Sequence, residues 1–137
     1  LKIVGKLSEN HRLELINADI DFENVVHLTD NEILSLYHSC DILLFASLAE
    51  GFGLPILEAQ TVGRAVITSN KGAMAEVAGK GALLVDPLSV ESIHNGLISI
   101  IHNDSLRALC IDEGFKNTHR YGSHFILAQH DSLFSSI

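Results

Sequence analysis

The sequence predicts an α/β domain with a doubly wound parallel sheet. Short apolar runs that are rich in β-branched residues alternate with stretches of helical periodicity. The runs place several apolar residues in succession, which is typical of strands buried on both faces, as in a parallel sheet. A length of 137 residues, with 47% hydrophobic and 19% charged residues, fits a single domain with a buried core.

Five of these runs are predicted to be strands, and we expect a parallel sheet of about five or six strands with helices on both faces. The predicted strands are residues 2–4, 24–28, 42–46, 65–68 and 82–85.

Helices are predicted between the strands and after the last of them. Pro55 at a first turn and Gly63 past the end frame one of them, and Gly79 ends another. Asp30 is the expected N-cap of the helix that carries Ile33, Leu36 and Tyr37 on one face. The predicted helices are residues 11–16, 32–40, 55–62, 73–78, 90–101, and the stretch from Asp104 to a break near Tyr121-Gly122. The fifth helix is expected to bury a stripe made of Val90, Ile93, Leu97, Ile100 and Ile101.

The charge balance excludes some partners. Nine Lys and Arg against 17 Asp and Glu give a net charge of −8, which argues against nucleic acid and anionic membrane as bulk partners. A small phosphorylated ligand needs only a local cluster of donors. Two cysteines, Cys40 and Cys110, do not make a disulfide framework and favour a reducing, cytoplasmic location. The densest apolar run has five residues, whereas a membrane span needs about 20.

One segment combines features of an anion site. Residues 47–59 run from the end of a predicted strand, through a loop with Gly51 and Gly53, into the helix that starts near Pro55. Ligands of open α/β sheets bind outside the carboxyl ends of the strands, so the segment lies at the expected edge. The glycines allow close approach of the backbone, and a helix amino terminus suits a phosphate.

Two carboxylates bracket this predicted phosphate site. Glu50 lies in the loop and Glu58 about one turn into the helix. A carboxylate beside a phosphate is better suited to accept hydrogen bonds from hydroxyls than to contact the phosphate. The pattern therefore predicts a nucleotide sugar, with Glu58 on the ribose and Glu50 on the hydroxyls of the transferred sugar.

The string Glu50-Gly51-Phe52-Gly53-Leu54-Pro55, followed by Glu58-Ala59, resembles the Glu-x7-Glu motif of retaining glycosyltransferases of the GT-B fold, family 4. Leu36-Tyr37 with Cys40-Asp41, residues 65–69 with Gly72 and Glu76-Val77, and residues 82–87 resemble its flanking elements in the same order. The resemblance runs from Leu1 to about Tyr121. It implies the C-terminal, Rossmann-like, donor-binding half of such an enzyme.

The resemblance implies roles for individual residues. The first glutamate of the motif contacts the donor sugar, the loop amides approach sugar and phosphates, and the second glutamate binds ribose. The nucleobase neighbourhood is expected around His27, Leu28 and Thr29, although the glycine usual there is missing. The implied donor-binding residues are Glu50, Gly51, Phe52, Gly53, Leu54 and Glu58, with Glu50 as the catalytic one.

The chain begins on a strand pattern without an initiator Met, so we expect residues 1–137 to be a fragment of a longer two-domain enzyme that is inactive alone. The family's diphosphate-binding Arg and Lys, and the domain that binds a sugar, lipid-linked or glycoconjugate acceptor, are expected upstream of Leu1. That domain would also provide any peripheral membrane contact. A C-terminal helix in residues 123–137 is expected to pack back on it.

The resemblance implies transfer from a nucleoside diphosphate sugar with retention, with no cofactor and no metal. The eight histidines show no close metal-ligand spacing. Two alternatives remain, a non-catalytic nucleotide-sugar-binding module and another GT-B enzyme such as a sugar-nucleotide epimerase or a phosphorylase. The sequence leaves open the base, sugar, acceptor, linkage and oligomeric state. Lys71 and Glu76 are interpreted as a surface lysine and a supporting residue.

Overall fold

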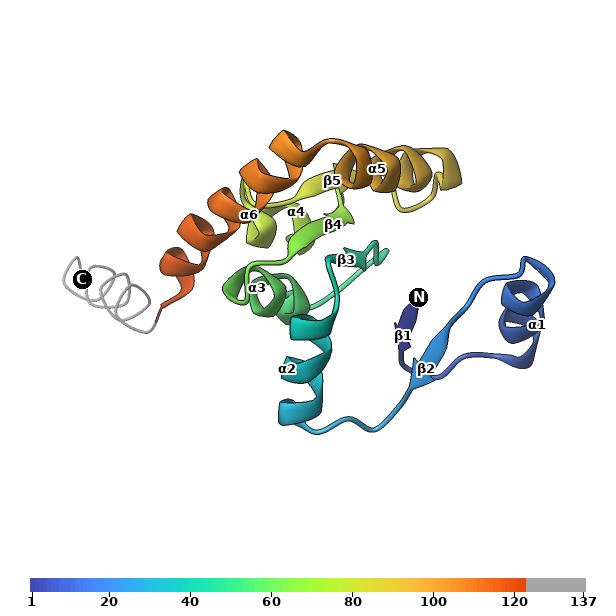
Figure 1. Ribbon diagram of the computed structural model, residues 1–137. Helices are drawn as coiled ribbons and strands as arrows, with labels where there is room; N and C mark the ends of the chain where they lie inside the picture. Colours follow the sequence, from blue (N-terminus) through green and yellow to red (C-terminus); the bar gives the residue numbers. More distant parts are fainter. Residues whose placement is uncertain (123–137) are drawn as a thin grey trace. The chain divides into compact units, whose positions relative to one another are not determined.

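The computed structural model describes residues 1–122, and the predicted helix of residues 123–137 lies outside the described residues. The chain divides into two compact units, Leu1–Cys40 and Asp41–Ile137 (Figure 1). Each unit contains parallel strands joined through helices, so the predicted α/β class is confirmed.

The first unit holds a parallel pair of strands and two helices. Its elements are β1 (Lys2–Val4), α1 (Glu9–Asn17), β2 (Glu23–Val25) and α2 (Asp30–Ser39). Ile3 is in register with Asn24, whose side-chain amide donates to the backbone oxygens of Ile3 at 3.0 Å and Gly5 at 2.8 Å. The Asn24 side chain on β2 thus holds the carboxyl end of β1 through two hydrogen bonds.

Local backbone geometry in this unit corrects two predictions. The strand expected over residues 24–28 ends at Val25, because His27 has a φ of 57°, a left-handed conformation that cannot continue a strand. The N-cap of α2 is Thr29, not Asp30. Thr29 and Glu32 form a capping box, in which each accepts a hydrogen bond from the other's backbone amide.

The second unit holds three parallel strands in the order β3-β4-β5. Its elements are β3 (Ile42–Phe45), α3 (Leu54–Thr61), β4 (Ala65–Ser69), α4 (Ala73–Ala78), β5 (Leu83–Val85), α5 (Val90–His102), α6 (Asp104–Thr118) and the 3-10 turn η1 (His119–Tyr121). Leu44 is in register with Ile67, which is in register with Leu83. The strands therefore form one sheet of two strands and one of three, whereas the sequence predicts a single sheet of about five or six strands.

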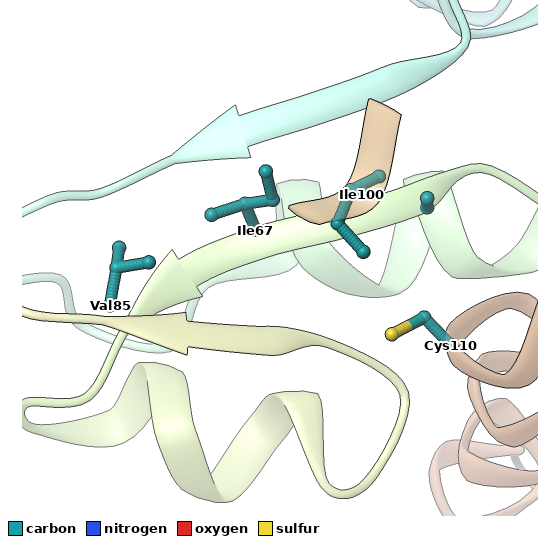
Figure 2. Packing of buried hydrophobic residues seen from close by; sticks show 5 residues of the cluster. Ile67, Val85, Ile100 and Cys110 are labelled. Carbon is teal, nitrogen blue, oxygen red and sulfur yellow. The ribbon is translucent and has the colours of Figure 1, made fainter. Parts of the chain in front are cut away.

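The central strand β4 is buried along its whole length. Ala65 and Ile67, two residues apart and so on one face, pack in a cluster with Val85, Ile100 and Cys110 (Figure 2). Helices α5 and α6 supply the last two of these side chains.

The apolar stripe predicted for α5 is only partly correct. Ile93 and Leu97 pack against the cluster and Ile100 is fully buried. Val90 and Ile101 are 84% and 48% exposed. Val90 is the first residue of the helix, and Ile101 lies about 100° around the helix axis from the buried Ile100.

A buried network of amides joins α3, α4 and α6. The Gln60 side chain donates to the carbonyl oxygens of Ala78 at 3.0 Å and Gly81 at 3.1 Å. Asn117 donates to the Gln60 side-chain oxygen at 2.8 Å and to the carbonyl oxygen of Val77 at 2.7 Å. Both amide side chains are at least 95% buried, so this network fixes the carboxyl end of α4 against the two longer helices.

Two glycines bring backbone against backbone beside this network. A Cβ atom added to Gly81 would lie 2.4 Å from the Cα atom of Gly114 in α6. A side chain at Gly81 would force α6 away from the chain segment that precedes β5, and a Cβ atom at Gly114 would lie 3.1 Å from the Gln60 Cγ atom. In the described part of the chain, none of the helices is both long enough and apolar enough to cross a membrane.

Candidate functional site

The predicted site segment follows β3. Since β3 runs parallel to β4, residues 47–53 form a loop at the carboxyl edge of the three-stranded sheet, and α3 starts from this loop. The segment thus occupies the edge at which ligands bind in open α/β sheets. We call residues 47–53 the 47–53 loop.

Gly53 shapes the entry into α3. It has φ 97° and ψ 39°, a left-handed conformation that glycine adopts without strain, and it is buried. Its carbonyl oxygen accepts a hydrogen bond from the Ile56 amide at 3.0 Å, and Pro55 stands in the first turn. Among residues 1–122, no side chain caps this helix end by a hydrogen bond, and the Gly53 backbone forms the start of the helix.

The two motif carboxylates are on the solvent side of this segment. Glu50 is exposed, and one of its carboxylate oxygens accepts a hydrogen bond from the Ser47 hydroxyl at 3.1 Å. Glu58 is exposed, four residues after Leu54, which is about 6 Å along the helix axis. Between them in the helix, Ile56 faces the core, whereas Leu54 is 58% exposed. The structure thus brings Glu50, the glycine loop and Glu58 together on one loop-helix unit.

An aromatic pair lies beside the loop. The rings of Phe52 and Tyr121 meet edge to face, with centroids 5.8 Å apart and planes at 83°. Phe52 is 45% exposed. The sequence predicts only that the helical stretch breaks near Tyr121, because nothing in the local sequence indicates which distant segment this residue contacts.

The neighbouring loops of the same edge carry an ion pair. Lys71, after β4, lies with its Nζ atom 3.3 Å from an Asp86 carboxylate oxygen, after β5. The Leu88 amide first and Lys71 second lower the pKa of the Asp86 carboxyl group. Within described residues 47–53, 70–72 and 86–89, Lys71 is the sole lysine or arginine. This lysine, interpreted from the sequence as a surface residue, is partly exposed and paired with Asp86.

The residues predicted near a nucleobase belong to the first unit. His27 lies in the bend after β2, and Leu28 leads to Thr29. The Thr29 hydroxyl donates to the Glu32 carboxylate at 2.6 Å and so serves the capping box of α2. Their role remains a prediction. Among residues 1–122, no three His, Cys, Asp or Glu side chains gather in a group that would hold a metal ion.

Comparisons with known proteins bear on this arrangement. The family model for glycosyl transferases group 1 matches residues 1–117. The chain is 32% identical to O-antigen chain mannosyltransferase B of Escherichia coli over 95 residues, which are 69% of this chain and 25% of that protein. It is 35% identical to the MMP alpha-(1->4)-mannosyltransferase of Mycolicibacterium hassiacum over 100 residues, which are 68% of this chain and 24% of that protein. The chain thus spans about a quarter of these relatives.

Solved structures are similar to this chain in fold. The C-terminal domain of a group 1 glycosyl transferase, LpcC of Francisella tularensis, is similar with a TM-score of 0.74 and 31% identity, covering 84% of this chain and 62% of that one. Alr3699/HepE of Anabaena, in complex with UDP and glucose, has a TM-score of 0.82 at 20% identity, covering 99% of this chain and 40% of that one. The predicted family and fold are confirmed. The chain belongs to the glycosyl transferases group 1, as a C-terminal domain of the GT-B fold.

Proposed function

We propose that this domain binds a nucleoside diphosphate sugar through the 47–53 loop and the amino end of α3. In the whole protein it would serve the retaining transfer of that sugar to an acceptor. The observation that carries the proposal is the left-handed, buried Gly53 at an α3 terminus without a side-chain cap, with one exposed carboxylate on each side. Backbone amides at such a terminus suit a phosphate group.

The two carboxylates divide the remaining parts of the donor between them. Glu58, one turn into α3, is proposed to accept hydrogen bonds from the ribose hydroxyls. Glu50, in the loop, is proposed to hold the hydroxyls of the sugar that is transferred. Gly51, Phe52, Gly53 and Leu54 would present the backbone between them, and His27, Leu28 and Thr29 the nucleobase neighbourhood.

Retention places particular demands on the site. No residue of the chain is assigned as a general base; the leaving phosphate is proposed to assist the acceptor while Glu50 steadies the sugar as its anomeric carbon becomes cationic. Helix amides would offset part of the charge on the departing diphosphate, together with basic side chains from the rest of the protein. No metal is proposed in this step.

The relatives support this assignment by their names. Two of them are mannosyltransferases, and the Anabaena structure of the same fold holds UDP and glucose. We propose that the acceptor, a sugar, a lipid-linked sugar or another glycoconjugate, binds to an N-terminal domain of the whole protein. We propose that the reaction occurs in the cytoplasm, where thiols such as those of Cys40 and Cys110 stay reduced.

Direct binding tests the proposal. The full-length protein is titrated by calorimetry with UDP, GDP and ADP and with a hexose conjugate of each. We expect saturable binding of one nucleotide series, and transfer from its hexose conjugate with retention of the anomeric configuration. Absence of binding in all three series would refute the proposal. Binding of a nucleotide sugar without transfer to any acceptor would favour the non-catalytic module.

Two variants then separate the roles of the carboxylates. Glu58→Ala should lose a charge-assisted hydrogen bond of about 1.5–3 kcal/mol to a part of the donor held equally in ground and transition states. We expect a KM for the nucleotide sugar raised by roughly 10- to 100-fold and weaker inhibition by free nucleotide. Glu50→Ala should lower kcat more than it lowers the affinity for free nucleotide, because free nucleotide has no sugar for Glu50 to hold.

A matched control removes a carboxylate elsewhere. Glu14 is exposed in α1, and Glu14→Ala should leave both constants unchanged. If Glu50→Ala abolished the binding of free nucleotide and Glu58→Ala did not, the two assignments would have to be exchanged.

A further inference from the structure

The geometry points to Tyr121 as a positioning residue for the 47–53 loop, acting on the donor sugar through Phe52. We propose that the ring of Tyr121 fixes the loop in the conformation that places Glu50. The inference rests on the proposed function and adds to it a residue outside the Glu-x7-Glu motif.

The contact between the two rings is specific in geometry. Edge-to-face packing at 5.8 Å and 83° is the arrangement that aromatic quadrupoles favour. Phe52 stays 45% exposed, so this is a surface contact and not part of the buried cluster. Its removal should change the loop without opening the core.

The loop needs an external contact for a physical reason. Phe52 stands between Gly51 and Gly53, and glycines leave the backbone many accessible conformations. The hydrogen bond from Ser47 to Glu50 lies within the loop itself. The contact between Phe52 and Tyr121 links the middle of this glycine-rich segment to a different element, η1.

Tyr121 is attached to the rigid part of the unit. The Arg120 guanidinium lies 5.7 Å from the centroid of the Tyr121 ring and donates to the Asn117 side-chain oxygen at 3.1 Å. Asn117 in turn belongs to the buried amide network with Gln60. A chain of contacts thus runs from the core of α3 and α6 to the partly exposed ring of Phe52.

The ring of Tyr121, more than its hydroxyl, should matter. The hydroxyl oxygen lies 3.5 Å from the Glu76 carbonyl oxygen, a long hydrogen bond that contributes little. Tyr121→Phe keeps the aromatic edge and should behave like the wild type. Tyr121→Leu removes the aromatic contact while keeping an apolar side chain of moderate size.

The test measures free nucleotide and nucleotide sugar separately in the full-length protein. Of UDP, GDP and ADP, the nucleotide that the wild type binds is used with its hexose conjugate. We expect Tyr121→Leu to lower kcat and the affinity for the conjugate by about 2- to 12-fold, the range of aromatic-pair energies, and to lower the affinity for free nucleotide less, because free nucleotide has no sugar for Glu50 to hold. Phe52→Leu should give the same pattern, and the double variant should be no worse than either single one.

Controls distinguish positioning from general damage. Phe115 of α6 is also 45% exposed, and its ring lies beside Gly63 at the far end of α3, so Phe115→Leu should leave both affinities unchanged. The inference is overturned if Tyr121→Leu lowers the affinities for free nucleotide and for the conjugate equally, or if it changes neither. It is also overturned if Tyr121→Phe does not keep the wild-type ratio of these two affinities. If the wild type binds no nucleotide, the proposed function falls first, and this inference with it.

Discussion

The two ends of helix α3 are built in opposite ways. At the amino end, a left-handed glycine without a side-chain cap opens into a loop whose Glu50 and Phe52 are exposed. At the carboxyl end, Gln60 is 99% buried and donates hydrogen bonds to two backbone carbonyl groups. One helix of 8 residues therefore has an exposed amino end, at which we propose that the donor binds, and a carboxyl end that buried hydrogen bonds hold in place.

The comparison indicates how the domain separates stability from binding. A helix end that binds a ligand must keep its amides accessible, which leaves them without partners inside the protein. Such an end contributes little to its own placement. The opposite end has no ligand to admit, so it can be fixed by buried hydrogen bonds, which hold the binding end through the stiffness of the helix.

The largest expected effect is at the closed end. Gln60→Ala removes the donor for the Gly81 carbonyl group and the acceptor for Asn117, and it leaves a cavity, so we expect a loss of about 2–4 kcal/mol in the free energy of unfolding. Urea unfolding measures the loss. Nucleotide titration below the unfolding transition should give the wild-type affinity. A variant of unchanged stability but weak nucleotide binding would break the proposed division.

The next effect is at the open end. Gly53→Ala places a Cβ atom at φ 97° and 3.3 Å from the Ile56 Cδ1 atom, and should cost about 1–2 kcal/mol of stability and displace the loop. Gly51→Ala is the matched control, because a Cβ there meets nothing within 4 Å. Thermal unfolding and nucleotide titration of both variants check this. Equal losses in the two would show that the left-handed turn does not shape the site.

The smallest effect concerns pH. The depressed pKa of Asp86 means that its stabilising contribution is present above the pKa of the unfolded state, about 3.9, and is lost as pH falls through the lower folded value. The difference in the free energy of unfolding between wild type and Asp86→Asn should therefore be constant near neutral pH and should decrease in acid. Lys71→Met should keep part of this dependence, because the Leu88 amide is the larger cause. Unfolding between pH 2 and 7 provides the measurement; a gap that widens in acid would contradict it.

Much of the fold could be predicted because it depends on local signals. The helix over residues 73–78 has the predicted bounds, with Gly79 directly after it, and α5 starts at Val90 as predicted. Errors arose where geometry depends on one residue or on distant packing. The left-handed His27 shortened a strand, and Val90, the first residue of its helix, is exposed although its spacing is that of a buried face.

The candidate site shows the same limit. The motif itself identified Glu50, the glycines and Glu58, since all of them lie in one short segment. Tyr121 and the pair of Gln60 and Asn117 depend on contacts between segments far apart in the sequence, and their residue types carry no local signal. The sequence predicts the chemistry of the loop, whereas the contacts that support the loop are visible only in three dimensions.

The backbone contact between Gly81 and Gly114 has a consequence for protein engineering. Because a Cβ atom at Gly81 would come within 2.4 Å of the Gly114 Cα atom, the two positions form a pair that combinatorial libraries should keep as glycine. The 47–53 loop is anchored at other residues. On the proposed function, we expect that loops of other family members can be grafted between β3 and α3, provided that these two glycines, the side chains of Gln60 and Asn117, and the contact between Phe52 and Tyr121 are retained.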